Sequence, residues 1–320
     1  MRFIDSSYEI IEQPPSIMGV FKQIEKAARL SYKSEDRITE DSAKKMVDTL
    51  VKNGHLACLE HGTIYLIIPD TAQTAADYDK YVYNQYSRVI DYNDSVYITT
   101  NARVLVENNW LDDLKYVCEP TEYHAKRISV KFTTSIGITR ELIRHRVFSF
   151  MNESTRYCNY SKGKFGSELT FIIPEWIHDI QAEIASYRNS KGESMDWLMS
   201  LTNNELLTAL SNNDEKVAVY WDCLNEAESS YNFLINNGLK AQDARSILPL
   251  DTKSEIIMTG FVEDWLHFFA LRSYIAATGK PHPDMLILAN NILMEFLDRG
   301  YISNEDIDRL KHEKQNKQSD

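Results

Sequence analysis

The sequence predicts an α+β fold in which a mixed or antiparallel sheet is flanked by helices. Strand-like and helix-like segments follow one another without the regular βαβ alternation that a parallel sheet requires. The 320 residues contain no glycine- or proline-rich linker, and 43% of them are hydrophobic, which is enough for a large packed core. We therefore expect one domain over residues 1–309 and a polar tail at 310–320.

The first half of the chain contains two clear helix patterns and two strand patterns. Apolar residues share one face over residues 41–53 and predict a helix that Gly54 ends. Residues 63–68 are rich in β-branched and aromatic side chains and precede a proline, so they predict a strand. Apolar residues alternate over 127–133, as in a half-buried strand, and a helix is expected from about 139 to 144.

The second half adds further elements of both kinds. Residues 169–174 predict a short strand, and apolar residues at helical spacing over 204–237 predict one or two helices. A strand at 255–261 leads into a helix at 262–278, and residues 283–299 predict the last strong helix. Mixed elements of this kind favour a sheet covered by helices.

Charge and cysteine content narrow the class of protein. A net charge of −12 and an isoelectric point near 5.2 argue against a nucleic-acid or membrane-surface binder. No stretch approaches the ~18 apolar residues of a membrane span, and the N-terminus lacks the apolar core of a signal peptide. The four cysteines form no CxxC pair. We expect a soluble cytoplasmic protein without a disulfide framework or zinc ribbon.

The densest group of chemically active side chains surrounds Arg144-His145-Arg146. Eight residues after Arg146 comes Ser154, followed by Thr155 and Arg156, so three arginines and a histidine fall within thirteen residues. Guanidinium groups bind phosphates in a bidentate manner, and hydroxyls can complete an anion site. This segment therefore predicts a phosphate-binding loop.

The segment from Arg144 to Tyr157 begins with RHR, continues with seven residues and a serine, and ends in RY. This pattern resembles the signature of the flavin-dependent thymidylate synthases. Other segments agree with that family in order along the chain. They are Ala27-Ala-Arg29-Leu-Ser31, Gly54-His55 with Glu60-His61, Ala244-Arg245 before Leu248-Pro249-Leu250, and His267-Phe268 before Leu271-Arg272.

The resemblance implies that family's fold and its reaction, conversion of dUMP to dTMP. It implies FAD as cofactor, NADPH and methylenetetrahydrofolate as co-substrates, no metal, and a homotetramer with sites built from several subunits. Arg272 is the implied catalytic residue, polarising the uracil by charge and hydrogen bonding. The implied dUMP-binding residues are Glu141, Arg144, Glu153, Ser154, Thr155, Arg156, Arg245 and Arg272. The implied cofactor-binding residues are His55, Ala57, Glu60, Arg144, His145, Arg146 and His267.

The chain also departs from the family pattern. Asn152-Glu153 lies one place later than the family's Asn-Glu, and Glu141 stands where a glutamine is common. Phe261-Val-Glu263 replaces an Asn-x-Arg triplet, although Asn101-Ala-Arg103 occurs upstream. The chain is longer than a minimal member, and residues 70–125 and 178–215 are expected to be insertions.

Other functions remain open at this level. His55, His61 and His124 could bind a metal in a hydrolase, although their spacing fits no zinc-hydrolase motif. Cys158 lies two residues after Arg156, where a thiolate nucleophile is conceivable. The RHR loop could also belong to a non-catalytic protein that binds a nucleotide or RNA. The negative net charge makes RNA binding the weakest of these alternatives.

Overall fold

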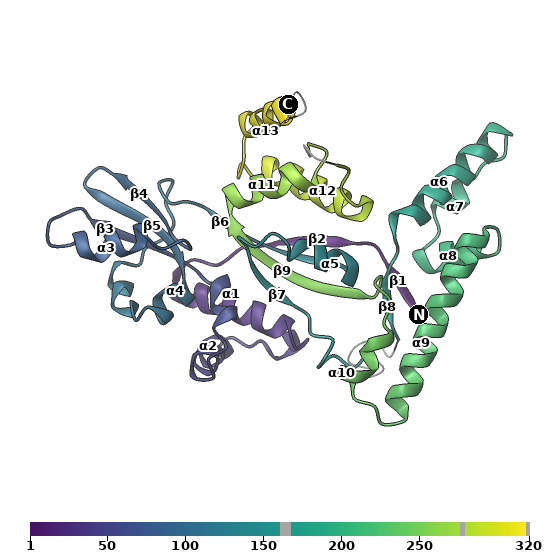
Figure 1. Ribbon diagram of the computed structural model, residues 1–320, viewed down its shortest axis with the longest axis horizontal. Helices are drawn as coiled ribbons and strands as arrows, with labels where there is room; N and C mark the ends of the chain where they lie inside the picture. The colour runs from purple at the N-terminus through teal and green to yellow at the C-terminus, as the bar shows by residue number, and fades with distance from the viewer. Residues whose placement is uncertain (161–167, 276–278, 318–320) are drawn as a thin grey trace.

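The computed structural model describes residues 1–160, 168–275 and 279–317 and is built around a four-stranded antiparallel sheet (Figure 1). The strand order is β2-β6-β9-β7. The strands are β2 (Ser7–Ile11), β6 (Arg127–Ser135), β9 (Lys253–Phe261) and β7 (Ser149–Asn152). The predicted α+β class, with an antiparallel sheet flanked by helices, is confirmed.

Helices cover both faces of this central sheet because its strands carry apolar side chains on both sides. On one face, α11 (Val262–Arg272) and α12 (Pro283–Asp298) pack aromatic residues against β6, with Trp265 6.4 Å from Phe132 between ring centroids. On the other face, α1 (Ser16–Leu30) packs against Ile257 of β9. Helix α2 (Ser42–Lys52) lies against α1, as the pattern over 41–53 predicts.

The expected insertion at 70–125 adds two strands to β3 (Thr63–Pro69), and the three form a second sheet at one end of the molecule (Figure 1). Its order is β3-β5-β4, all antiparallel. The added strands are β4 (Arg88–Tyr92) and β5 (Ser95–Asn101); the helices are α3 (Ala75–Val82), α4 (Ala102–Glu107) and η3 (Leu111–Tyr116). Buried Leu66, Tyr81 and Ile98 give this unit its own core.

The expected insertion at 178–215 lies at the opposite end, within a helical unit (Figure 1). Strand β1 (Arg2–Ile4) pairs in parallel with β8 (Thr170–Ile172) and packs Phe3 and Phe171 into the same apolar cluster. The helices are α6 (Glu175–Ser190), α7 (Asp196–Met199), α8 (Asn203–Ser211), α9 (Glu215–Asn236) and α10 (Ala241–Ala244). The pattern over 204–237 thus forms two helices.

Two helices differ in extent from the sequence prediction. Helix α5 (Ile136–Leu142) begins before residue 139 because the Ser135 hydroxyl accepts a hydrogen bond from the backbone N–H of Ile138. Helix α11 ends at Arg272, since the extended Ser273 donates its hydroxyl to the Phe269 carbonyl. Residues 276–278 of the predicted helix lie outside the described residues.

The last helix of the chain, α13 (Asn304–Lys317), continues regular backbone into the segment expected as a polar tail. Ile307 and Leu310 of this helix are buried against the central core. Besides η3, the described residues include the short 3-10 helices η1 (Glu35–Arg37), η2 (Leu56–His61) and η5 (Arg245–Ile247).

Candidate functional site

The ends of α5 and α11 bring three predicted site residues together. Arg272, the last residue of α11, donates from Nη1 to Glu141 Oε2 of α5 at 2.7 Å and from Nε to His145 Nε2 at 3.2 Å. The pair is half-buried, with the Arg272 side chain 17% and the Glu141 side chain 27% exposed. The structure therefore places the carboxylate that replaces the family's glutamine directly on the implied catalytic arginine.

His145 is buried and uncharged at neutral pH. Burial lowers its pKa to about 4, and the positive charge of Arg272 and the neighbouring His267 and Arg144 act in the same direction. A neutral imidazole can accept a hydrogen bond at Nε2, which agrees with the Arg272 contact. The ring also packs edge-on against Phe268 at 5.0 Å between centroids. His145 is thus fixed in place rather than poised to titrate.

A second group of predicted residues lies beyond the other end of β7. Strand β7 is four residues long, about 13 Å of extended chain, and separates the RHR segment from Ser154. Here Arg245 Nη1 donates to the Thr155 hydroxyl at 3.0 Å, while the Arg156 guanidinium lies over the Tyr157 ring at 5.4 Å. Hydroxyls and guanidinium groups from two distant segments therefore meet at this position.

Glu153 is engaged in a compact ion cluster. Its carboxylate accepts from Lys253 Nζ at 3.0 Å and from the Tyr160 hydroxyl at 3.0 Å, and Lys33 Nζ lies 3.6 Å away. Lys33 and Lys253 also contact Glu255, whose pKa they lower to about 2 against the opposing effect of burial. This cluster was not foreseen from the sequence. The alternating charges at 253 and 255 on a predicted strand are the signal that could have found it.

Asn152, directly before Glu153, has a different environment. Its side-chain Oδ1 is buried and has no hydrogen-bond partner among the described residues. If the family motif is aligned on its serine at Ser154, the glutamate of the family's Asn-Glu pair falls at position 152 of this chain. Asn152 is therefore a candidate site residue, which the predicted dUMP-binding set does not include.

The upstream cofactor candidates lie on the opposite face of the central sheet. His55 and Ala57 are exposed at the start of η2, and Glu60 pairs with Arg103 of α4, which also binds Glu107 at 2.7 Å. Arg103 belongs to the Asn101-Ala-Arg103 triplet noted above. Among the described residues, no hydrogen bond or ion pair joins this group to Glu141, His145 or Arg272.

The substituted triplet Phe261-Val-Glu263 at the start of α11 also contacts the segment 70–125, which is expected to be an insertion. Arg88 of β4 stacks over the Phe261 ring at 4.4 Å and contacts Glu263 Oε2 at 3.4 Å. Glu263 thus has a cationic partner from the insertion.

The three histidines considered as metal ligands are dispersed. His61 is buried with Nδ1 2.8 Å from the Thr259 hydroxyl, His124 contacts the Leu66 carbonyl oxygen at 3.1 Å, and His55 is exposed. Over the described ranges, no three His, Cys, Asp or Glu side chains are grouped to hold a metal ion. The metal-hydrolase alternative therefore lacks a ligand set in this part of the chain.

Cys158 is fully buried, and burial together with nearby Glu153 raises its pKa to about 12. A thiol in this state is protonated at neutral pH and is not a nucleophile.

The fold and these groups define an α+β protein with arginine-rich loops beside an antiparallel sheet. Residues 120–298, more than half of the chain, match the family model described as thymidylate synthase complementing protein. The chain belongs to this family, and the predicted resemblance to flavin-dependent thymidylate synthases is confirmed.

Curated relatives carry matching names. The chain is 27% identical over 168 residues to a flavin-dependent thymidylate synthase of Synechocystis sp., an alignment that covers 52% of this chain and 66% of that protein. It is 31% identical over 139 residues to the flavin-dependent thymidylate synthase of Corynebacterium efficiens, covering 43% of this chain and 46% of the relative. The chain therefore spans about half to two thirds of the length of these relatives.

Among solved structures, the chain is similar to a UMP/dUMP methylase, PolB, from Streptomyces cacaoi. In complex with 5-Br UMP, that protein superposes with a TM-score of 0.42 at 15% identity, covering 98% of this chain and 95% of the other. Separately, none of the helices in the described ranges has the length and apolar character needed to cross a lipid bilayer.

Proposed function

We propose that this protein is an FAD-dependent thymidylate synthase. It would transfer a one-carbon unit from methylenetetrahydrofolate to C5 of dUMP, with NADPH-reduced flavin providing the hydride that completes the methyl group. The observation that carries the proposal is the group of Arg272, Glu141 and His145 beside the RHR segment. Family membership and the names of the curated relatives support the same reaction.

The phosphate of dUMP is assigned to arginines without acidic partners. Arg144, Arg156 and Arg245 form no ion pair with any carboxylate in the described ranges, so their charge is available for a ligand. A guanidinium binds a phosphate through two parallel hydrogen bonds, and Ser154 and Thr155 supply hydroxyls beside it. In this proposal Glu153 serves mainly to hold the loop through Lys253, and Asn152 offers an amide to the nucleotide.

Arg272 is assigned to the uracil ring. A guanidinium keeps its proton at neutral pH, so it acts by charge and hydrogen bonding, which polarise the ring and make C5 electron-rich. Neutral His145 accepts from Nε and fixes the direction of the side chain. Glu141 balances the charge until the nucleotide arrives. This combination orients the arginine without neutralising it completely.

The residues present also suit a flavin dinucleotide. Arg144 and Arg146 are exposed and have no carboxylate partner among the described residues, as a pyrophosphate site requires. His145 and His267 lie nearby, and His55, Ala57 and Glu60 are assigned to the same cofactor from another surface. Bound flavin supplies the hydride, and the chain binds and orients it.

We further propose that the active site is shared between subunits of a homotetramer. The assigned residues occupy three places on one subunit: the ends of α5 and α11, the segment after β7, and η2 on the opposite sheet face. Partner subunits would bring these surfaces together. The acidic balance supports a small-molecule enzyme of the cytoplasm without nucleic-acid partners.

The test is tritium release from dUMP labelled at C5, with methylenetetrahydrofolate and NADPH, in the presence and absence of FAD. Release that depends on FAD is expected. Folded, flavin-supplied protein that binds dUMP but releases no tritium would refute the synthase and favour the non-catalytic nucleotide-binding alternative.

A further inference from the structure

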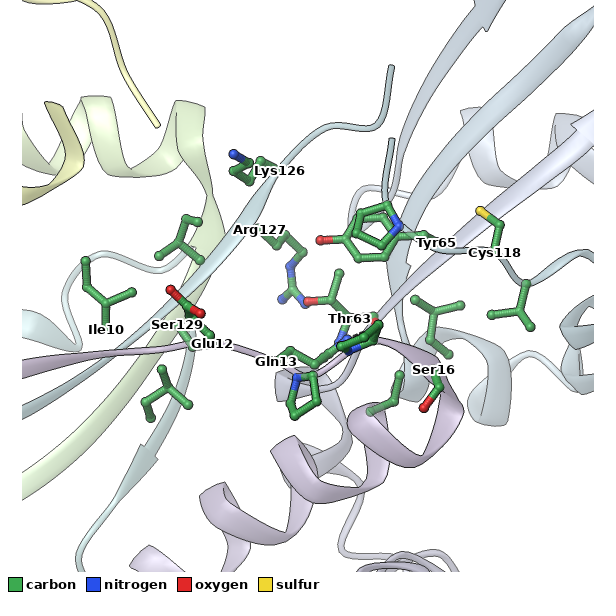
Figure 2. Close-up of a pocket in the computed structure, with 18 of the residues that line it drawn as sticks. Ile10, Glu12, Gln13, Ser16, Thr63, Tyr65, Cys118, Lys126, Arg127 and Ser129 are labelled. Atoms are coloured by element: carbon green, nitrogen blue, oxygen red, sulfur yellow. Dashed lines mark hydrogen bonds between the residues drawn. The ribbon is translucent and has the colours of Figure 1, made fainter. Parts of the chain in front are cut away.

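A cavity of about 490 Å³ lies between the central sheet, the N-terminus of α1 and the inserted sheet (Figure 2). Its walls come from the end of β2 and the loop after it, the start of β3, and the start of β6. None of the residues assigned to dUMP or FAD lines it. The cavity is therefore separate from the site described above.

The polar feature of this cavity is Arg127 at the first position of β6. Figure 2 shows that its side chain extends between Ser129 and Tyr65 towards Thr63. Its Nη1 donates to the Glu60 carbonyl oxygen at 3.0 Å and to the Thr63 hydroxyl at 3.3 Å, and its Nη2 donates to the Ser149 hydroxyl at 3.5 Å. Its Cζ lies 5.5 Å from the centroid of the Phe261 ring. Its Nε is buried without any partner in the described part of the chain.

No carboxylate among the described residues lies within ion-pair distance of this guanidinium, in contrast to Arg103 and Arg272. Burial lowers the pKa of Arg127 to about 10, so the group is still charged at neutral pH. The Glu60 and Asp264 carboxylates stabilise this charge only from beyond ion-pair distance, and its hydrogen-bond acceptors are all neutral. A half-buried cation in such surroundings is costly. Such a group indicates an anionic partner that is not part of the chain.

The surroundings favour an anion over a cation. Lys126 stands at the rim, with Nζ 4.7 Å from the Tyr301 ring centroid. The N-terminus of the 15-residue helix α1, at Ser16, also faces the cavity and adds the positive end of its dipole. The one acidic lining residue, Glu12, is paired with Arg299 at 2.6 Å.

The remaining wall is rigid and apolar. Gln13 is fixed to the backbone of Thr63 by two hydrogen bonds of 2.9 and 2.8 Å, which hold the loop against β3. The other walls are aliphatic side chains and prolines: Ile10, Ile11, Pro14, Pro15, Val20, Ile64, Val117, Pro120 and Ile128. A ligand here needs an apolar body as well as a charged group.

We propose that this cavity is a second binding site, for a small molecule that carries a carboxylate or phosphate on an apolar body. The anionic group pairs with the Arg127 guanidinium, and the apolar body lies against the aliphatic wall. The lining of this site includes no residue assigned to dUMP or FAD, although Arg127 also contacts the backbone carbonyl of Glu60.

The test is isothermal titration calorimetry of the full chain with phenyl phosphate, benzoate and neutral benzyl alcohol, in the presence of saturating dUMP. The two anions are expected to bind the wild type, and the alcohol at least tenfold more weakly. Tighter binding of phenyl phosphate would identify a phosphate ligand, and tighter binding of benzoate a carboxylate. Arg127→Gln should weaken both anions at least tenfold, whereas Arg188→Gln, a change on the exposed surface of α6, should leave them unchanged.

Equal affinity in the wild type and Arg127→Gln, or no binding of either anion, would overturn the proposal. A second variant covers the case in which Arg127→Gln does not fold. Lys126→Gln at the exposed rim should weaken both anions several-fold, and unchanged affinity would count against the site. Thermal unfolding of ligand-free Arg127→Met gives an independent check: an unchanged or raised midpoint is expected, and a fall of more than ten degrees would assign the arginine a purely structural role.

Discussion

Replacing Arg272 with alanine separates its part in the reaction from its part in the fold. The change removes the ion pair with Glu141 and the hydrogen bond to His145. Because the pair is half-buried and Glu141 can be rehydrated, its loss costs up to about 1 kcal/mol. The hydrogen bond adds about 1 kcal/mol. The sum of about 2 kcal/mol is small beside the ~5–15 kcal/mol of a typical domain, so the variant should fold.

Turnover should respond far more strongly than stability. Removing one donor that stabilises developing charge in an active site lowers kcat by about 10²- to 10³-fold. The assay is tritium release from labelled dUMP, together with the midpoint of denaturant unfolding for the same preparation. Arg188→Ala, which removes an exposed arginine paired with Glu193, is the matched control and should leave both quantities unchanged.

The contact between Arg272 and His145 allows a second, spectroscopic test of this prediction. The charge of Arg272 helps to lower the pKa of His145 to about 4. Without that charge, the His145 pKa should move upward, towards the ordinary value near 6.5. Titration of the imidazole by NMR measures this shift. Near-normal tritium release in Arg272→Ala would refute the catalytic assignment, and an unchanged His145 pKa would refute the contact itself.

Three further predictions concern the scaffold. In Gly260→Ala the new Cβ would lie 2.4 Å from Phe148 Cδ1, so overpacking should reduce the free energy of unfolding by about 1–3 kcal/mol in a denaturant titration. Burial lowers the pKa of His61 to about 3, so only the unfolded chain gains its proton between pH 6.5 and 3, and stability should fall as pH falls. His61→Gln should make the loss between pH 7 and pH 5 about 2 kcal/mol smaller, and an unchanged slope would contradict the assignment. Ser135→Ala removes the N-cap of α5 and should cost about 1 kcal/mol, with faster amide exchange in that helix.

The sequence predicts the two inner strands of the central sheet because each has a local signature, whereas β2 and β7 were not predicted. Alternation over 127–133 identified β6, and the apolar run at 255–261 identified β9. Pairing of those two strands places α5 and α11 on one side of the sheet, which brings position 141 close to position 272. The helix limits were harder to predict, since the Ser135 hydroxyl caps the start of α5 and the backbone becomes extended at Ser273 after α11.

The candidate site was only partly visible in the sequence. The RHR signature predicts which residues carry the chemistry, but it does not say which of two adjacent residues faces inward. The structure engages Glu153 with Lys253 and leaves the Oδ1 atom of Asn152 without a partner. That outcome depends on the alternation of side chains along β7 and on lysines a hundred residues away, so no local pattern could reveal it.

The departures from the family pattern and the first insertion are physically linked. Glu263 stands where the family has an arginine, and a carboxylate there would repel an anionic cofactor. Arg88, from the inserted β4, contacts that carboxylate, while Arg103, from the inserted α4, pairs with Glu60. The expected insertion thus supplies a cationic partner to both Glu263 and Glu60. Glu263 is unfavourable when the family motif is considered alone. In the folded chain, its charge is compensated by Arg88, which lies outside that motif.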